Sequence, residues 1–207
     1  MSRRLSVDEC VAALNEGRVV ALPTDTVYGL AARWDLPHAV EEIFELKRRP
    51  RDVALPVLVA STDQITATGA PWPDPARRLA THFWPGALTI ATPVPPELAR
   101  RIGALDSVGW RQPGAPLTLE VLQRTGPLAV TSANRHGQDP GRSADEVLRI
   151  FTETPLAGVL DGGDCQGVVS TVMELRESSW WVRRRGGVAS EAITEILGTP
   201  PEPSADR

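Results

Sequence analysis

The chain has 207 residues, of which 42% are hydrophobic and 23% are charged, so it can bury one hydrophobic core. It contains no apolar run long enough to span a membrane, and its N-terminus lacks the apolar segment of a secretory signal. Two cysteines, Cys10 and Cys165, are too few for a disulfide framework or a zinc site, which favours a reducing cytoplasm. The net charge of −4 argues against a generic nucleic-acid coat, so any anion site depends on local clusters.

The first half of the chain predicts alternating helices and strands. Residues 6–9 read Ser-x-x-Glu, a capping box that begins a helix running to about residue 16. Pro37 suits the first turn of a second helix, which Pro50 ends because proline cannot continue a helix. A third helix contains Leu79. Strands are predicted from short apolar runs, in chain order RVVAL at 18–22, LPVLVA at 55–60 and the end of WPGALTIATPVP at 84–95.

The second half continues the alternation and ends in a proline-rich tail. Ser190 is a candidate cap for the last helix, and residues 199–207 are expected to be disordered. The absence of a clean boundary predicts a single α/β domain over residues 1–198, built around a twisted, mostly buried sheet. The predicted strands lie in SVGWR (107–111), PLAVTSAN (127–134), AGVLDGG (157–163), VVSTVMEL (168–175) and WWVRRRGG (180–187), and the helices in LTLEVLQRTG (117–126), ADEVLRIF (144–151) and SEAITEIL (190–197).

Basic residues crowd the end of the second predicted helix, in KRRPRD at 47–52. One or two cations would satisfy the helix dipole, at ~0.3–1 kcal/mol each, but four cations within residues 47–51 repel one another. An anionic ligand would relieve that repulsion, and the side chains of Lys47 and Arg49 suit phosphate or carboxylate. Pairing with the dipole and binding of an anion are equally open interpretations of this cluster.

Three other polar stretches lie near predicted strand ends, where functional residues often occur. The stretch at 24–28 holds two threonines, an aspartate and a tyrosine, which also suit a hydrogen-bonded turn. Residues 131–137 (TSANRHG) can hold a phosphate or form a plain turn, and His136 is expected to be solvated. Strand alternation places Arg184 on the opposite face from its two arginine neighbours, so that one face meets solvent and the other a candidate cavity. The chain contains no P-loop, dinucleotide-binding or zinc-protease motif.

Taken in order, these stretches resemble the YrdC/Sua5 family of threonylcarbamoyl-AMP synthases. The resemblance covers about residues 7–198 and implies a YrdC-like domain, in which a twisted mixed β-sheet with flanking helices encloses a large basic cavity. It implies that L-threonine, bicarbonate and ATP give threonylcarbamoyl-AMP and pyrophosphate, with magnesium on the phosphates. The matching segments are LPTDTVYGLAA, IFELKRRP, FWPGALT, SVGWRQP, PLAVTSAN, DGG, STV and the arginine that precedes the glycines.

The resemblance also implies partners and residue roles. Partner proteins would take up the adenylate to modify the tRNA adenosine next to the anticodon, RNA could be bound directly, and no membrane is involved. Lys47 and Arg49 would be catalytic and bind the triphosphate and carbamate oxygens, and Arg111 would hold the threonine carboxylate. The resemblance implies that ATP is contacted by Arg49, Ser107, Ser132, Asn134 and Arg184. It implies that threonine or carbamate is also contacted by Thr26 and Ser170. No protein ligand for a metal is implied, so the metal would be held mainly by ATP.

The chain departs from the family pattern on the threonine side. Val53 stands where many relatives have asparagine, and Leu58 stands roughly where they have histidine. SVGWRQPGAP also lacks a histidine, and GVVSTV lacks a glutamate, that are common in relatives. Two alternatives therefore remain: a YrdC-like paralogue acting on another carbamoyl substrate, and a non-catalytic RNA-binding module. Replacing Lys47 or Arg49 by alanine is expected to lower turnover and leave the fold intact.

Overall fold

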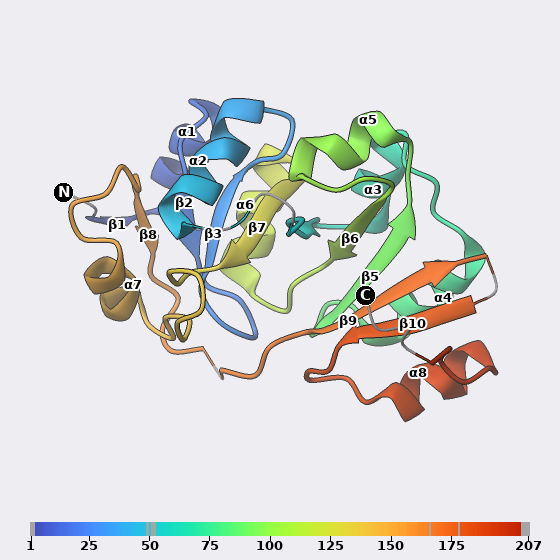
Figure 1. Ribbon diagram of the computed structural model, residues 1–207. Coiled ribbons are helices and arrows are strands. Elements are labelled where there is room, and N and C mark those ends of the chain that lie inside the picture. The colour runs from blue at the N-terminus through green and yellow to red at the C-terminus, as the bar shows by residue number, and fades with distance from the viewer. Residues whose placement is uncertain (1–2, 49, 51–52, 166, 178, 204–207) are drawn as a thin grey trace.

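The structure is a computed structural model that describes residues 3–48, 50, 53–165, 167–177 and 179–203 (Figure 1). Within these ranges ten strands form one twisted mixed sheet in the order β1-β8-β2-β3-β7-β4-β6-β5-β9-β10, so the expected α/β fold is confirmed. The strands are β1 (Arg3–Leu5), β2 (Val20–Leu22), β3 (Gly29–Arg33), β4 (Val57–Leu58), β5 (Leu88–Pro93), β6 (Ser107–Arg111), β7 (Leu128–Ser132), β8 (Gly158–Leu160), β9 (Thr171–Arg176) and β10 (Ser179–Arg184). The helices are α1 (Val7–Asn15), α2 (Pro37–Lys47), α3 (Thr62–Ala67), α4 (Asp74–Phe83), α5 (Pro96–Ala99), the 3-10 turn η1 (Arg100–Ile102), α6 (Pro116–Thr125), α7 (Ala144–Ile150) and α8 (Ser190–Leu197).

Helices cover both faces of the sheet. Along β3, Leu30 and Ala32 pack in one apolar cluster, whereas Ala31 packs in a second cluster on the opposite face. The first cluster includes Ile43 of α2 and Leu79 of α4, and the second is closed by α1 and α6, which lie side by side. No described helix combines the length and the apolar character that crossing a bilayer requires.

Local sequence signals set several helix ends as predicted. The Ser6 hydroxyl accepts from the backbone N–H of Glu9, and the Glu9 carboxylate accepts from the N–H of Ser6, so the capping box at the start of α1 is confirmed. Pro37 occupies the first turn of α2. This helix ends earlier than Pro50, because Arg48 adopts a left-handed conformation (φ 53°) directly after Lys47.

Other boundaries differ from the sequence prediction. The run at 55–60 forms a strand only over Val57–Leu58, and α3 and α5 were not predicted. The sequence offers a start signal for each, Ser61 before α3 and Pro96 at the start of α5, but both helices are short and neither has a side-chain hydrogen bond at its N-cap. Ser190 was predicted as a cap but is the first residue of α8, whose N-cap is Ala189.

Part of the predicted disordered tail contacts the sheet. The backbone N–H of Glu202 donates to the carbonyl of Trp180 at 2.7 Å, and the indole N–H of Trp180 donates to the carbonyl of Thr199 at 2.9 Å. Residues 199–203 therefore lie along β10, the edge strand, whereas residues 204–207 lie outside the described residues.

Candidate functional site

A pocket brings together five of the predicted site residues. Its volume is about 140 Å³, and its lining includes Thr26, Arg111, Ser132, Ser170 and Arg184. Ligand pockets for drug-sized molecules measure ~300–1,000 Å³, so the enclosed space suits a small molecule and is smaller than the large cavity that the resemblance implies.

The pocket lies over one face of the sheet. Leu58, Arg111 and Val130, from β4, β6 and β7, line the pocket. Their chain neighbours Trp110 and Ala129 pack into the apolar cluster on the opposite face. Because side chains alternate along a strand, the same strands build a firm core on one side and a site on the other.

The polar stretch at 24–28 forms a hydrogen-bonded turn that covers this face. The Thr24 hydroxyl donates to the carbonyl of Val27 at 2.6 Å and accepts from the N–H groups of Thr26 and Val27, both at 3.1 Å. The Tyr28 hydroxyl donates to the carbonyl of Gly163 at 2.9 Å, which ties the turn to the loop after β8. The plain structural interpretation is therefore correct, but the turn also lines the pocket.

Arg111 is the deeper of the two pocket arginines. Its side chain is 7% exposed, and its three nitrogens donate to three different oxygens. Nε donates to the carbonyl of Gly86 at 2.9 Å, Nη1 to the Thr26 hydroxyl at 3.1 Å and Nη2 to Asp25 Oδ1 at 2.6 Å. Burial lowers the pKa of Arg111, and the nearby Asp25 carboxylate opposes this shift. Asp25 was not among the predicted site residues.

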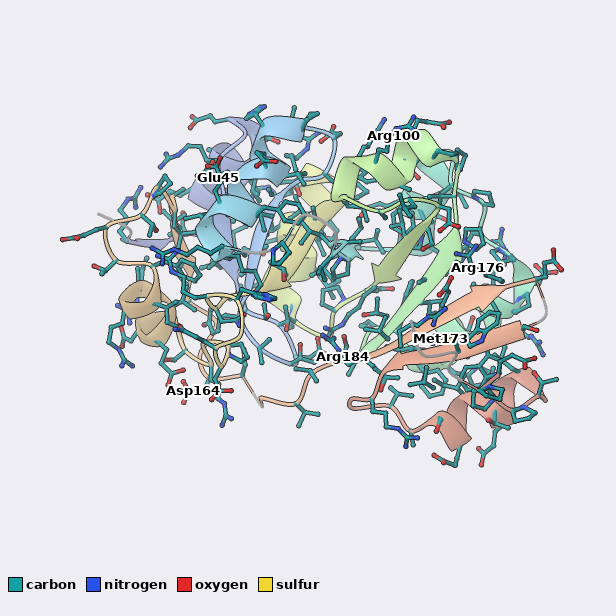
Figure 2. All side chains as sticks on the ribbon, viewed as in Figure 1. Glu45, Arg100, Asp164, Met173, Arg176 and Arg184 are labelled. Atoms are coloured by element: carbon teal, nitrogen blue, oxygen red, sulfur yellow. The ribbon has the colours of Figure 1, made fainter. Side chains whose placement is uncertain are left out.

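Arg184 lies at the mouth of the pocket. The residue is exposed as a whole, but Nε donates to the carbonyl of Ser170 at 3.1 Å and Nη2 to its hydroxyl at 2.9 Å. The Ser170 hydroxyl also hydrogen-bonds the hydroxyl of Thr89 at 3.1 Å. Figure 2 shows Arg184 near the middle of the view, where β9 and β10 approach the rest of the sheet. Among the described residues no carboxylate pairs with Arg184, so its charge is available to an anion.

Lys47 is buried beside the pocket, at the C-terminus of α2. Its side chain donates to the Ser132 carbonyl at 2.7 Å and to Asn134 Oδ1 at 2.5 Å, and the Ser132 hydroxyl donates to the same amide oxygen at 2.7 Å. Ser132 thus connects Lys47 and Asn134 to the pocket, although neither of these two lines it. Arg49 lies outside the described residues.

Two other predicted or considered residues lie away from the pocket. Ser107 is at the start of β6, about 13 Å from Arg111 along the strand at ~3.3 Å per residue, and it is not part of the lining. The His136 side chain is exposed, as expected, and only its backbone N–H contacts the cluster, by donating to the Lys47 carbonyl at 2.8 Å.

The described residues offer no group of three or more His, Cys, Asp or Glu side chains that could hold a metal ion. The pocket is otherwise lined by hydroxyls, two guanidinium groups and an apolar wall that includes Leu58 and Val130. Such a site can bind an anion, and among the described residues no histidine lines the pocket to activate one of its hydroxyls.

The chain is similar to known proteins in both its sequence and its fold. A sequence model named Sua5_yciO_yrdC, with the description "Telomere recombination", matches residues 12–186. Threonylcarbamoyl-AMP synthase of Bacillus subtilis (strain 168) is 38% identical over 93% of this chain and 56% of its own length, so the chain spans about half of that relative. A putative threonylcarbamoyl-AMP synthase of Mycobacterium tuberculosis (strain ATCC 25618 / H37Rv) is 37% identical over 95% of this chain and 91% of its own. The crystal structure of Pyrococcus abyssi Sua5 complexed with L-threonine superposes with a TM-score of 0.88 at 34% identity, covering 97% of this chain and 61% of that one.

Proposed function

The chain belongs to the Sua5/YciO/YrdC family, and from this premise we propose that it is a threonylcarbamoyl-AMP synthase. It would convert L-threonine, bicarbonate and ATP into threonylcarbamoyl-AMP and pyrophosphate. The observation that carries the proposal is the arrangement of charge in the pocket. One guanidinium lies deep inside, at Arg111, and a second without a described acidic partner lies at the mouth, at Arg184.

This arrangement fits two anionic substrates of different size. A space of about 140 Å³ admits an amino acid, whose carboxylate would meet Arg111. The phosphates of ATP would lie across the mouth, near Arg184, Ser132 and Asn134. The family resemblance assigns Arg49 to the same end, and this assignment stays a prediction. Ser107 is not part of this proposal, because it lies away from the pocket.

The chemistry needs positioning more than it needs a protein nucleophile. The threonine amine adds to the carbon of bicarbonate, and water leaves, to form a carbamate. A carbamate oxygen then bonds to the α-phosphorus of ATP while the bond to pyrophosphate breaks. The protein holds the two anions together and neutralises developing charge on the phosphates. Magnesium on the phosphates would supply further positive charge to the leaving pyrophosphate.

The test is mass spectrometry of the reaction mixture, using the purified full chain with ATP, L-threonine and ¹³C-labelled bicarbonate. The proposal predicts an adenylate that contains threonine and carries the ¹³C label, together with equimolar pyrophosphate. Omitting any one substrate should abolish both products. The absence of a threonine-dependent adenylate under conditions where the folded chain binds ATP would contradict the proposal.

A second candidate is favoured by the apolar wall of the pocket. Leu58 lines the pocket at a position where many relatives are expected to be polar, and Val130 lies beside it. A YrdC-like paralogue acting on another carbamoyl substrate would use such a wall to hold a more apolar amine. A panel of amino acids in the same assay separates the two, because the mass of the adenylate identifies the amine that was used.

Downstream, we propose that tRNA-modifying partner proteins consume the adenylate, since a mixed carbamoyl-phosphate anhydride is suited to acylating an amine. A non-catalytic RNA-binding module would behave differently. It would bind tRNA with an affinity that falls steeply with salt, and it would consume no ATP.

A further inference from the structure

The acidic partner of Arg111 has so far no role in the proposed reaction. Asp25 lies in the turn between Thr24 and Thr26, and its Oδ1 accepts from Arg111 Nη2 at 2.6 Å and from the backbone N–H of Gly114 at 2.9 Å. The Asp25 side chain is 20% exposed. A Cβ atom added at Gly114 would lie 3.4 Å from the Asp25 Cβ, so the chain at this glycine packs closely against the aspartate. The carboxylate is therefore fixed from two sides.

The hydrogen bonds of Arg111 leave some of its N–H groups for a ligand. A guanidinium has five N–H groups, one on Nε and two on each terminal nitrogen. Among the described residues Gly86, Thr26 and Asp25 accept one N–H from each nitrogen. One N–H therefore remains on each terminal nitrogen, so Arg111 can still donate two hydrogen bonds to a ligand.

From this geometry we propose that Asp25 is a positioning residue, which holds the Arg111 guanidinium so that its two remaining N–H groups are presented to the substrate carboxylate. The proposal rests on the proposed function for the identity of that substrate. It assigns no contact between Asp25 and the substrate, because Asp25 acts through Arg111. The Gly86 carbonyl and the Thr26 hydroxyl accept from the other two nitrogens, Nε and Nη1.

The charges around Arg111 explain why an acid is needed there. Arg111 is deeply buried, and the positive charge of Arg184 further lowers its pKa, so the two guanidinium groups repel each other across the pocket. Without Asp25, a buried cation would face a second cation with only neutral oxygens to hold it. The side chain would then swing toward solvent, and the deep end of the pocket would lose its anion site.

The experiment compares Asp25→Ala, Asp25→Asn and Arg111→Gln in steady-state assays of the full chain. Asp25→Ala should raise the KM for L-threonine about 10- to 100-fold, as expected for the loss of a charge-assisted hydrogen bond, and change the KM for ATP less than about threefold. Asp25→Asn keeps an acceptor oxygen at the same place and should recover part of that loss. In the Arg111→Gln background, Asp25→Asn should not change the KM for L-threonine further, because the guanidinium that Asp25 positions is absent. Asp35→Ala, which removes a partner of Arg33 outside the pocket, is the matched control and should change neither KM.

Any of three results would overturn the proposal. In Asp25→Ala, the KM for L-threonine and the KM for ATP could rise equally. Asp25→Asn could be as impaired as Asp25→Ala, or Asp25→Asn could raise the KM for L-threonine in the Arg111→Gln background as much as it does in the wild type. A purely structural role predicts the first of these together with a lower melting temperature.

A second readout separates this inference from the proposed function. In ¹⁵N-arginine-labelled protein without ligand, the Nε–H signal of Arg111 is identified as the one that disappears in Arg111→Gln. This signal should be sharp and its proton slow to exchange with solvent in the wild type. In Asp25→Ala it should broaden. If the signal behaves so but no threonine adenylate forms, the positioning holds and the proposed function fails. If the signal is unchanged in Asp25→Ala, Asp25 does not position Arg111.

Discussion

Lys47 provides the sharpest test of how the site is tied to the fold. The sequence places it at a polar helix end and predicts that its removal leaves the fold intact. In the structure it is 2% exposed, and hydrogen bonds of 2.7 Å to the Ser132 carbonyl and 2.5 Å to Asn134 Oδ1 join α2 to the residues around the end of β7. Removing Lys47 should therefore cost stability as well as turnover, which changes the expectation drawn from the sequence.

The size of the effect follows from the contacts. Each short charge-assisted bond is worth ~1.5–3 kcal/mol, and truncating a large buried side chain to alanine adds a cavity cost of ~2–5 kcal/mol. The alanine variant no longer has to bury an ammonium group, and this offsets several kcal/mol of the loss. We therefore expect Lys47→Ala to lower the free energy of unfolding by about 3–5 kcal/mol. Lys47→Met keeps most of the stem volume and should be more stable than Lys47→Ala by about 2 kcal/mol.

The assay is urea unfolding followed by tryptophan fluorescence, with thermal melts in parallel. For a chain of this size the expected loss corresponds to roughly 10 °C in melting temperature. Both variants should also lose at least about 100-fold in pyrophosphate release. A Lys47→Ala protein that melts within about 2 °C of the wild type would show that the buried ammonium does not hold α2 to β7.

Three further predictions follow from single residues. Arg184→Gln removes the cation at the pocket mouth and should lower kcat/KM for ATP about 100-fold, whereas Arg185→Gln, one residue on and also exposed, should not; equal effects would place ATP elsewhere. His136→Ala should change turnover less than about twofold, because the side chain is exposed and only its backbone contacts the site; a large loss would reveal acid–base chemistry at this histidine. Burial raises the pKa of Cys10 from 9.0 to about 12, so the unfolded thiol loses its proton first. Stability should then fall as pH rises from 9 toward 12, and the fall should be shallower in Cys10→Ala; identical slopes would refute this.

Local features of the fold could be predicted from the sequence. The Ser6 capping box, the proline that begins α2 and the strand at 107–111 all depend on residues close together in the chain. Helix α3 was missed although Ser61 precedes it, because 6 residues are too few to show a helical pattern of apolar residues. Short elements of this kind are stabilised by tertiary packing, in this case by burial of Ile65.

The site was predictable only where its residue types were distinctive. Hydroxyl and arginine residues at strand ends led to Ser132 and Arg184, and the family resemblance led to Arg111; all three line the pocket. Asp25 could not be assigned, because its partner Arg111 lies 86 residues away and the pairing depends on the sheet order. Ser107 shares a strand face with Arg111, but alternation alone does not say how far along the strand the pocket extends.

The most direct test of the account is a crystal structure of the full chain with L-threonine and α,β-methylene-ATP, an analogue that resists cleavage at the proposed bond. The account predicts the threonine carboxylate on the two open N–H groups of Arg111, inside the pocket. It predicts the α-phosphate at the mouth, close to the amine and within reach of Arg184. Threonine bound outside the pocket, or a nucleotide whose α-phosphate lies far from the threonine amine, would contradict it.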